Sequence, residues 1–228
     1  MDLRILFLLF MIYSCLGWIM EVVLVSLQKG KLVTRGFLIG PYLPIYGFGA
    51  TFITMFLSRY YDDIVVLFVM SCVLGALLEY FTSYIMEKIF KTRWWDYSNR
   101  KYNINGRVCV NTTLSFGLLG VILIRYLNPF FENLLNGFPN LLLTFLAMIL
   151  WIIIVLDTVV SFNIISNIKR TYLSSAKDTT EEVSKIVKEK LKNSSILYKR
   201  LVNAFPNLKF TLYKNFENIK NKTTHKDV

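Results

Sequence analysis

Histidine and cysteine are scarce in this sequence: its 228 residues include one histidine, His225, and three cysteines. Cys15 and Cys72 stand inside long apolar runs, and Cys109 stands at the start of another. No CxxC pair and no cluster of cysteine with histidine occurs, although zinc sites and disulfide frameworks are built from such patterns. The sequence therefore predicts no metal site and no disulfide framework, and we expect no bound cofactor.

Charged residues are also scarce, at 18% of the chain, whereas a soluble domain contains about 25%. No GxxxxGK[ST] phosphate-binding loop is present, so any ATPase must be another chain. No pair of nucleophile and base is visible, so we expect that this chain is not an enzyme. The formal net charge of +11 would suit a nucleic-acid-binding protein. Most of this charge flanks apolar runs, however, which favours a membrane protein with no nucleic acid partner.

Apolar residues are concentrated in five runs, and a run of about 20 such residues predicts a helix that spans the lipid bilayer. The expected spans are residues 3–27, 41–57, 64–85, 108–126 and 141–165. The predicted fold class is therefore all-α, a polytopic helical membrane protein with its transmembrane domain in residues 1–168. The remainder, residues 169–228, is a basic tail, in which residues 180–205 show the apolar spacing of an amphipathic surface helix.

The distribution of lysine and arginine predicts the orientation, because short basic connections stay in the cytoplasm. The first and third connections are basic, as is the tail, whereas the second and fourth are not. We therefore expect a multi-pass protein of the cell membrane, with its N-terminus outside and its basic tail in the cytoplasm.

The two halves of the apolar part resemble each other. The matched residues are Gly17 with Gly75, Glu21 with Glu79, Gly36 with Gly106 and Gly47 with Gly117. The last two pairs are each 70 residues apart. This pattern predicts a duplicated two-helix unit, with repeat A at about residues 10–62 and repeat B at about 68–132. Because each unit contains two spans, the halves share one orientation, as in parallel repeats.

The second half is longer by about 12 residues, since 27 residues separate Glu79 from Gly106 but 15 separate Glu21 from Gly36. The extra residues fall in the block RWWDYSNRKYNINGR, which is predicted to lie at the cytoplasmic membrane surface. Aromatic residues are common at that surface, but a simple aromatic belt does not explain the asparagines. The residues of this cytoplasmic motif are Trp94, Trp95, Asp96, Tyr97, Ser98, Asn103, Asn105 and Gly106.

Three acids stand inside predicted spans, where a charge is costly and normally faces a partner or a cavity. Counted from the outer ends, they fall at one depth, which predicts a common polar chamber that opens toward the cytoplasm. Arg35 and Arg107 are candidate partners of Glu21 and Glu79. The alternative is that buried ion pairs only fix the helix packing. The candidate substrate or gating residues are Glu21, Glu79, Asp157, Arg35, Arg107 and Asn111.

The stretch RGFLIGPYLPIYGFG is rich in glycine and proline where the second span should begin. Proline removes backbone donors, and irregular backbone at membrane depth survives only when it is buried in protein or lines water. The stretch therefore predicts a broken helix at a solute site, or else a loop whose proline starts a helix. The residues of this broken-helix motif are Gly36, Gly40, Pro41, Pro44 and Gly47.

With the stretches YSCLGWIMEV, RGFLIGPYLPIYGFGA, LEYFTSYIMEKIF and RWWDYSNRKYNINGR, residues 10–165 resemble the CmpB-like ABC-transporter permeases, called type IV. The resemblance implies a permease subunit in the lipid bilayer that works with a separate ATPase subunit. Five spanning helices would form only a thin wall around a transport pathway, so we also expect a homo- or hetero-oligomer. Two other functions stay open: a membrane enzyme acting on a lipid head group, and a non-catalytic assembly or sensor protein.

Overall fold

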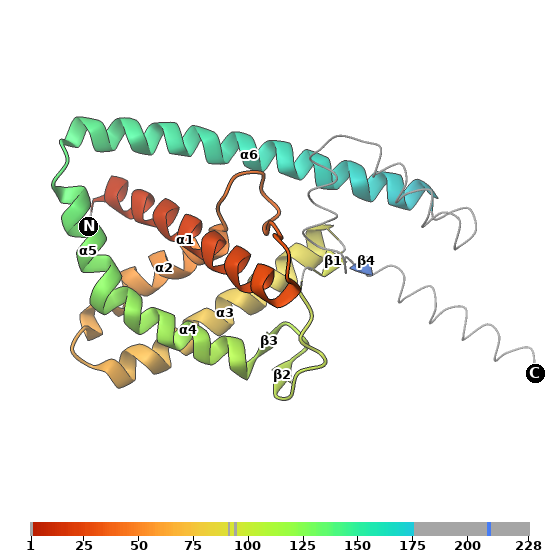
Figure 1. Ribbon diagram of the computed structural model, residues 1–228, viewed down its shortest axis with the longest axis horizontal. Helices are drawn as coiled ribbons and strands as arrows, with labels where there is room; N and C mark the ends of the chain where they lie inside the picture. Colours follow the sequence, from red (N-terminus) through yellow and green to blue (C-terminus); the bar gives the residue numbers. More distant parts are fainter. Residues whose placement is uncertain (1, 91, 94, 176–208, 211–228) are drawn as a thin grey trace, which may run out of the picture.

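The computed structural model describes residues 2–90, 92–93, 95–175 and 209–210, and these residues are mostly helical (Figure 1). The helices are α1 (Leu3–Lys29), α2 (Pro44–Leu57), the 3-10 turn η1 (Ser58–Tyr60), α3 (Ile64–Phe90), α4 (Val110–Ile122), the π-helical turn η2 (Leu123–Leu127), α5 (Asn128–Asn136) and α6 (Asn140–Ser175). The strands are β1 (Thr92–Arg93), β2 (Asn103–Ile104), β3 (Val108–Cys109) and β4 (Lys209–Phe210). Antiparallel pairs form between β1 and β4 and between β2 and β3. The all-α membrane fold is thus confirmed. The predicted tail helix at 180–205 and Trp94 lie outside the described residues.

Four helical segments in the described part of the chain are long and apolar enough to cross a membrane. They are Leu3–Lys29, Ile64–Ile89, Val110–Asn136 and Asn140–Ile164. The third of these runs without interruption through α4, η2 and α5. The predicted span at 41–57 corresponds to α2, which has only 14 residues. At 1.5 Å per residue it is about 21 Å long, short of the roughly 30 Å of hydrocarbon. The prediction of five full spans is therefore corrected to four.

The residues before α2 explain why it is short. Gly36 has a φ of 100°, which no helix allows, and the chain stays irregular until Pro44 begins α2. Leu43 donates its N–H to the carbonyl of Ser14 at 2.9 Å. Since Ser14 lies 15 residues from the end of α1, the loop reaches about 22 Å along that helix. The chain is thus irregular before α2 and Pro44 begins the helix, whereas a solute site at the broken-helix motif stays a prediction.

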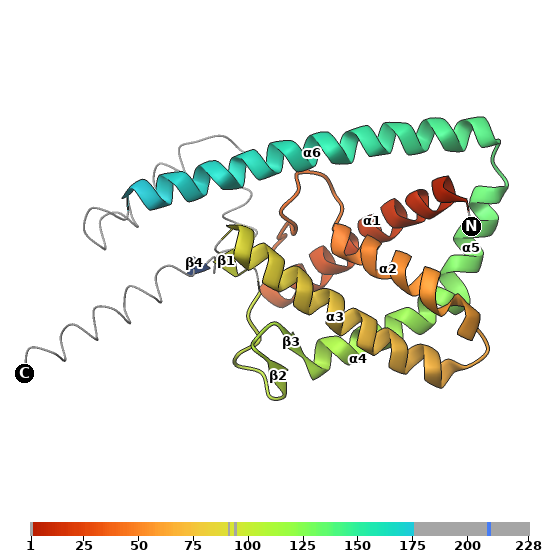
Figure 2. The ribbon, with the colours of Figure 1, turned by 180° about the vertical axis from the view of Figure 1, so that it is seen from behind.

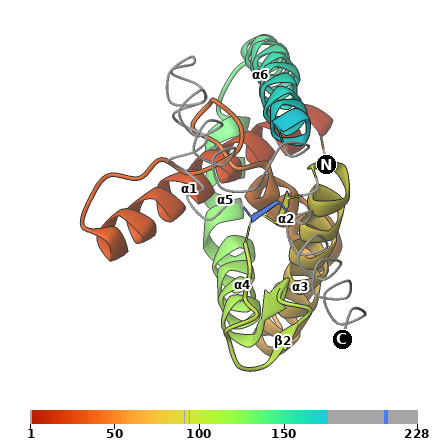
Figure 3. The same cartoon turned by 90° about the vertical axis from the view of Figure 1, so that its right-hand side faces the viewer.

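The helices pack as two antiparallel pairs with α6 along one edge (Figures 1 and 2). Helix α1 lies against α2, α3 lies against α4, and α2 joins the pairs by packing on α3. A core of large apolar side chains forms where they meet, including Leu9, Ile53, Leu57, Leu67 and Leu123. The view along the bundle shows α6 at one edge and α4 with the β2–β3 hairpin toward the other (Figure 3).

Glycines allow close contact within both pairs. A side chain at Gly17 would overlap the ring of Tyr46, and one at Gly75 would come within 2.6 Å of the Cβ of Phe116. Tyr46 and Phe116 are 70 residues apart, like Gly36 with Gly106 and Gly47 with Gly117. Further along the helices, Gly47 faces Phe10 and Gly117 faces Phe68. The two helix pairs therefore use glycine in similar contacts, and the duplication stays a prediction from the sequence.

Candidate functional site

Glu21, in the C-terminal half of α1, forms the first polar cluster with residues from the loop and α2. The hydroxyl of Tyr46 donates to its Oε1 at 2.8 Å. Arg35 lies with its Nε 3.4 Å from Oε2, so the predicted pairing of Arg35 with Glu21 is present. The indole N–H of Trp18 donates to the carbonyl of Arg35 at 3.0 Å, which fixes the start of the loop against α1.

Glu79, the equivalent acid on α3, has a different set of partners. It accepts hydrogen bonds from the hydroxyls of Tyr97 at 3.1 Å and Thr112 at 2.9 Å. Only 5% of its surface is exposed. Among the residues that the structure describes, none forms an ion pair with Glu79. The charge of Glu21 is near enough to act on it. The carboxyl group is therefore satisfied by neutral donors alone.

Arg107 was expected to pair with Glu79, and this expectation is wrong. Its guanidinium lies 2.8 Å from Glu87 and donates to Ser83 at 3.2 Å. These residues follow Glu79 at intervals of four on α3, so they present one helix face to the loop. The long third connection carries Arg107 two turns further out, where Glu87 also binds Arg93 at 3.2 Å.

Asp157, the third acid, does not join the other two. Its carboxylate accepts the backbone N–H groups of Ile39 at 2.8 Å and Gly40 at 2.7 Å. It also accepts the hydroxyls of Tyr42 at 2.5 Å and Ser161 at 2.9 Å. All these donors belong to α6 or to the loop before α2. Asp157 thus attaches the loop to α6, and its hydrogen-bond partners differ from those of Glu21 and Glu79.

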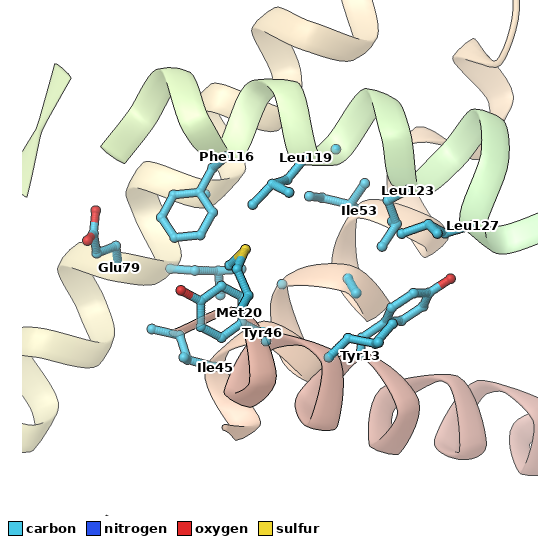
Figure 4. A pocket seen from close by; sticks show the side chains of 17 residues that line it. Tyr13, Met20, Ile45, Tyr46, Ile53, Glu79, Phe116, Leu119, Leu123 and Leu127 are labelled. Carbon is cyan, nitrogen blue, oxygen red and sulfur yellow. The ribbon is translucent and has the colours of Figure 1, made fainter. Parts of the chain in front are cut away.

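A cavity of about 240 Å³ lies between the two helix pairs. Figure 4 shows Glu79 at one end of it and Tyr13 at the other. Its lining is otherwise largely apolar, with the aromatic rings of Tyr46 and Phe116 near the Glu79 end. Asn111 is exposed and does not line this cavity. The cavity touches α1, α2, α3 and the rod formed by α4 and η2, so every element of the two pairs contributes to its wall.

The residues predicted as the cytoplasmic motif fold into a compact loop over the C-terminal end of α3. Trp95 donates its indole N–H to the carbonyl of Arg107 at 3.0 Å. Asn103 accepts the N–H of Gly106 at 2.8 Å, and the side-chain amide of Asn105 donates to the hydroxyl of Tyr80 at 3.0 Å. The asparagines thus bind neighbouring parts of the protein.

Two residues of this loop have shifted acidity. Desolvation acts to raise the pKa of Asp96, but hydrogen bonds from Ser98 and the charge of Arg93 outweigh it and lower that pKa. Burial raises the pKa of Tyr97, and the negative charge of Glu79 raises it further. Asp96 is therefore held ionised and Tyr97 is held neutral as a donor to Glu79.

One hairpin turn and one buried group of polar side chains were not predicted from the sequence. Asn105 and Gly106 take φ values of 53° and 68° at the tip of the β2–β3 hairpin. An Asn-Gly pair is the strongest short signal for such a turn, so this hairpin was predictable. A buried trio in the outer half was not: Asn128 accepts from Tyr13 at 2.5 Å and donates to Thr54 at 2.8 Å. These three residues lie far apart in sequence, and no local pattern joins them.

Comparison with known families gives one match, and it covers most of the membrane part. The profile of the family described as "Putative ABC-transporter type IV" matches residues 8–162. Neither a curated protein nor a solved structure matches the chain. The matched range includes Glu21, the loop before α2, Glu79, the cytoplasmic motif and Asp157. With four membrane-spanning helices and a family match over this length, the chain belongs to the CmpB-like family of type IV ABC transporters.

Proposed function

We propose that this chain is the membrane-spanning subunit of an ABC-type transporter, and that its substrate occupies the cavity between the two helix pairs. The family match carries the transporter assignment. The cavity adds a place for the substrate, since ligand sites often lie between the helices of bundles. No phosphate-binding loop occurs in the sequence, so the ATPase is a separate chain.

The polar clusters at the inner end of the cavity are suited to gating. Glu21 connects α1 to α2 through Tyr46, and Glu79 connects α3 to α4 through Thr112. Tyr97 adds the cytoplasmic loop to the Glu79 cluster. A movement of that loop would therefore change the hydrogen bonds of Glu79, which lines the cavity.

The β2–β3 hairpin is a suitable contact for the ATPase. It lies at the end of the bundle that carries both basic connections (Figure 1). Tyr102 and Ile104 are 82% and 62% exposed there. An ATPase that moves this hairpin would act on Tyr97 through the backbone hydrogen bond between Tyr97 and Gly106, which is 2.8 Å long.

The test is purification of the tagged chain from native membranes in mild detergent, followed by mass spectrometry and an ATPase assay. We expect a stoichiometric ATPase partner. Substitution of Tyr102 by alanine should reduce its recovery several-fold, whereas Asp62→Asn at the opposite end should not change it, since Asp62 is exposed and outside both clusters. A stable complex that contains no ATPase would overturn the proposal.

A further inference from the structure

The charge balance around the cavity indicates what kind of molecule it takes. Glu79 is buried and receives only neutral hydroxyl donors, and Glu21 is a second acid nearby. An acid inside a membrane helix is costly unless a cation or a proton compensates it. Arg35 is placed at Glu21, and Arg107 and Arg93 are placed at Glu87. Among the described residues no cation lies at Glu79, so a proton or a cationic ligand is left to compensate its carboxyl group.

Aromatic rings stand beside this acid. Tyr46 and Phe116 both line the cavity, with ring centroids 6.3 Å apart and planes inclined by 49°. The electron-rich faces of aromatic rings attract ammonium groups, and the attraction is stronger where water is excluded. A carboxylate next to two aromatic rings favours a cationic head group over a neutral or anionic one.

The rest of the cavity is apolar. Beyond the rings its wall is formed by side chains such as Leu16, Met20, Leu119 and Leu123, with glycines that leave room between the helices. Such a wall offers nothing to a polar chain but stabilises an alkyl chain by about 0.8 kcal/mol per buried CH₂ group. The volume of about 240 Å³ limits the chain to a short one.

We propose that the cavity binds an amphipathic cation, with an ammonium head group at Glu79 beside Tyr46 and Phe116 and a short alkyl chain directed toward Tyr13. This inference rests on the proposed function only in calling the ligand a substrate; binding itself needs no ATPase. The ligand bridges the two helix pairs, since its head contacts α3 and its chain contacts α1 and α2.

The experiment uses the purified full chain in phosphatidylcholine nanodiscs and compares three probes with the same alkyl chain: octylammonium, octanol and octanoate. Calorimetric titration, with empty nanodiscs subtracted, gives the affinities at pH 7. We expect octylammonium to bind at least tenfold more tightly than either other probe. Glu79→Gln keeps the shape of the side chain but removes its charge, and should abolish this preference while leaving octanol binding unchanged.

Two further variants test whether the preference depends on the acid at the cavity and whether the alkyl chain of the ligand lies inside the cavity. Asp62→Asn removes an exposed acid far from the cavity and should leave the preference intact. Gly49 lines the cavity, and a methyl group there would have Leu78 as its nearest neighbour at 3.9 Å, so Gly49→Ala fits the fold. It should weaken octylammonium binding several-fold by narrowing the cavity.

Equal affinity for octylammonium and octanol in the unmodified protein would overturn the inference, as would a preference that survives Glu79→Gln. Either result would leave the transporter assignment standing, with a different class of substrate. Conversely, failure to find an ATPase partner would overturn the proposed function and leave a positive binding result intact. The two proposals therefore fail separately.

Discussion

Asp157 joins α6 to the loop before α2. Its carboxylate receives four donors, three of them from the loop before α2. Two of those three donors are backbone N–H groups that have no helix to satisfy them. In a bilayer such groups must find a partner inside the protein. We therefore assign Asp157 a structural role in holding the irregular loop, distinct from the acids at the cavity.

Substitution of Asp157 by alanine should destabilise the protein by about 3 kcal/mol, because the N–H groups of Ile39 and Gly40 lose their acceptor. Thermal unfolding followed by circular dichroism in detergent would measure this loss. Thr158→Ala is the matched control, since that hydroxyl only donates to Ile154 on its own helix. If both variants unfold at the same temperature as the unmodified protein, Asp157 does not hold the loop.

Tyr97 should make the protein sensitive to alkali. Its pKa in the folded protein is raised above the unfolded value by burial and by Glu79. A raised pKa contributes stability that is fully present below the unfolded pKa, about 10 for tyrosine, and is lost as the pH rises toward the folded one. We expect Tyr97→Phe to lose less stability than the unmodified protein between about pH 9 and 11, the range in which the tyrosine of the unfolded chain titrates.

The readout for Tyr97 is the melting temperature across this pH range, and Tyr102→Phe is the control because Tyr102 is 82% exposed. At neutral pH, Tyr97→Phe should cost about 1 kcal/mol for the lost hydrogen bond to Glu79. An identical alkaline decline in the unmodified protein and in Tyr97→Phe would show that another group causes it.

Sequence reasoning located the acids but only part of their surroundings. Glu21, Glu79 and Asp157 are conspicuous because charge inside an apolar run is rare. Arg35 follows Glu21 closely, and their pairing was correctly predicted. The partner of Arg107 was not, because its position depends on the fold of a 12-residue insertion. Three-dimensional proximity of this kind carries no signature in local spacing.

At the level of the helices, glycine controls how closely each pair packs. Small residues let membrane helices approach each other, and both pairs here use a glycine opposite an aromatic ring. The ring lies on the partner helix and also lines the cavity. The close contact therefore sets the position of Tyr46 and Phe116 and, through them, the shape of the binding space.

Gly75→Ala should destabilise the α3–α4 pair by about 1–3 kcal/mol, since the added methyl group would lie 2.6 Å from the Cβ of Phe116 and cannot be accommodated without movement. Gly49→Ala, also on a cavity-lining helix, has free space and should be neutral or slightly stabilising because alanine favours the helix. Thermal unfolding of the two variants in parallel gives the comparison. Equal effects would mean that the pair tolerates a wider separation.

The length of α2 shows where hydropathy alone fails. The run at 41–57 is apolar enough to suggest a span, but apolar composition does not report whether the backbone is helical. Gly36, Pro41 and the loop attachment at Asp157 keep residues 36–43 irregular. The loop then covers part of the depth that a full helix would have crossed. The broken-helix motif is visible in the sequence, but hydropathy alone does not show how far it shortens the helix.

On the scale of the whole molecule, the bundle has two distinct ends. The basic first and third connections lie at the same end, next to the strands and the outgoing part of α6 (Figure 1). The N-terminus, η1 and α5 lie at the other end, where Arg4 donates to Thr144 at 2.9 Å and so joins α1 to the start of α6. In the part of the chain that the structure describes, four helices have full length, and α2 with its loop returns the chain between these ends.

This arrangement predicts the accessibility of single cysteines placed in a background without Cys15, Cys72 and Cys109. Because basic connections remain in the cytoplasm, Asp62→Cys should react with a membrane-impermeable maleimide on intact cells. Lys31→Cys and Tyr102→Cys, which are exposed at the opposite end, should react only after permeabilisation.

The two alternatives to this labelling pattern have different meanings. The reverse pattern would place the strands and the basic connections outside the cell and would exclude the β2–β3 hairpin as a contact for a cytoplasmic ATPase. Labelling of Asp62→Cys and Lys31→Cys from the same side would mean that α2 and its loop do not return the chain across the bilayer. In that case the cavity between the helix pairs would lack its α2 wall, and the bundle would have to be completed by another chain.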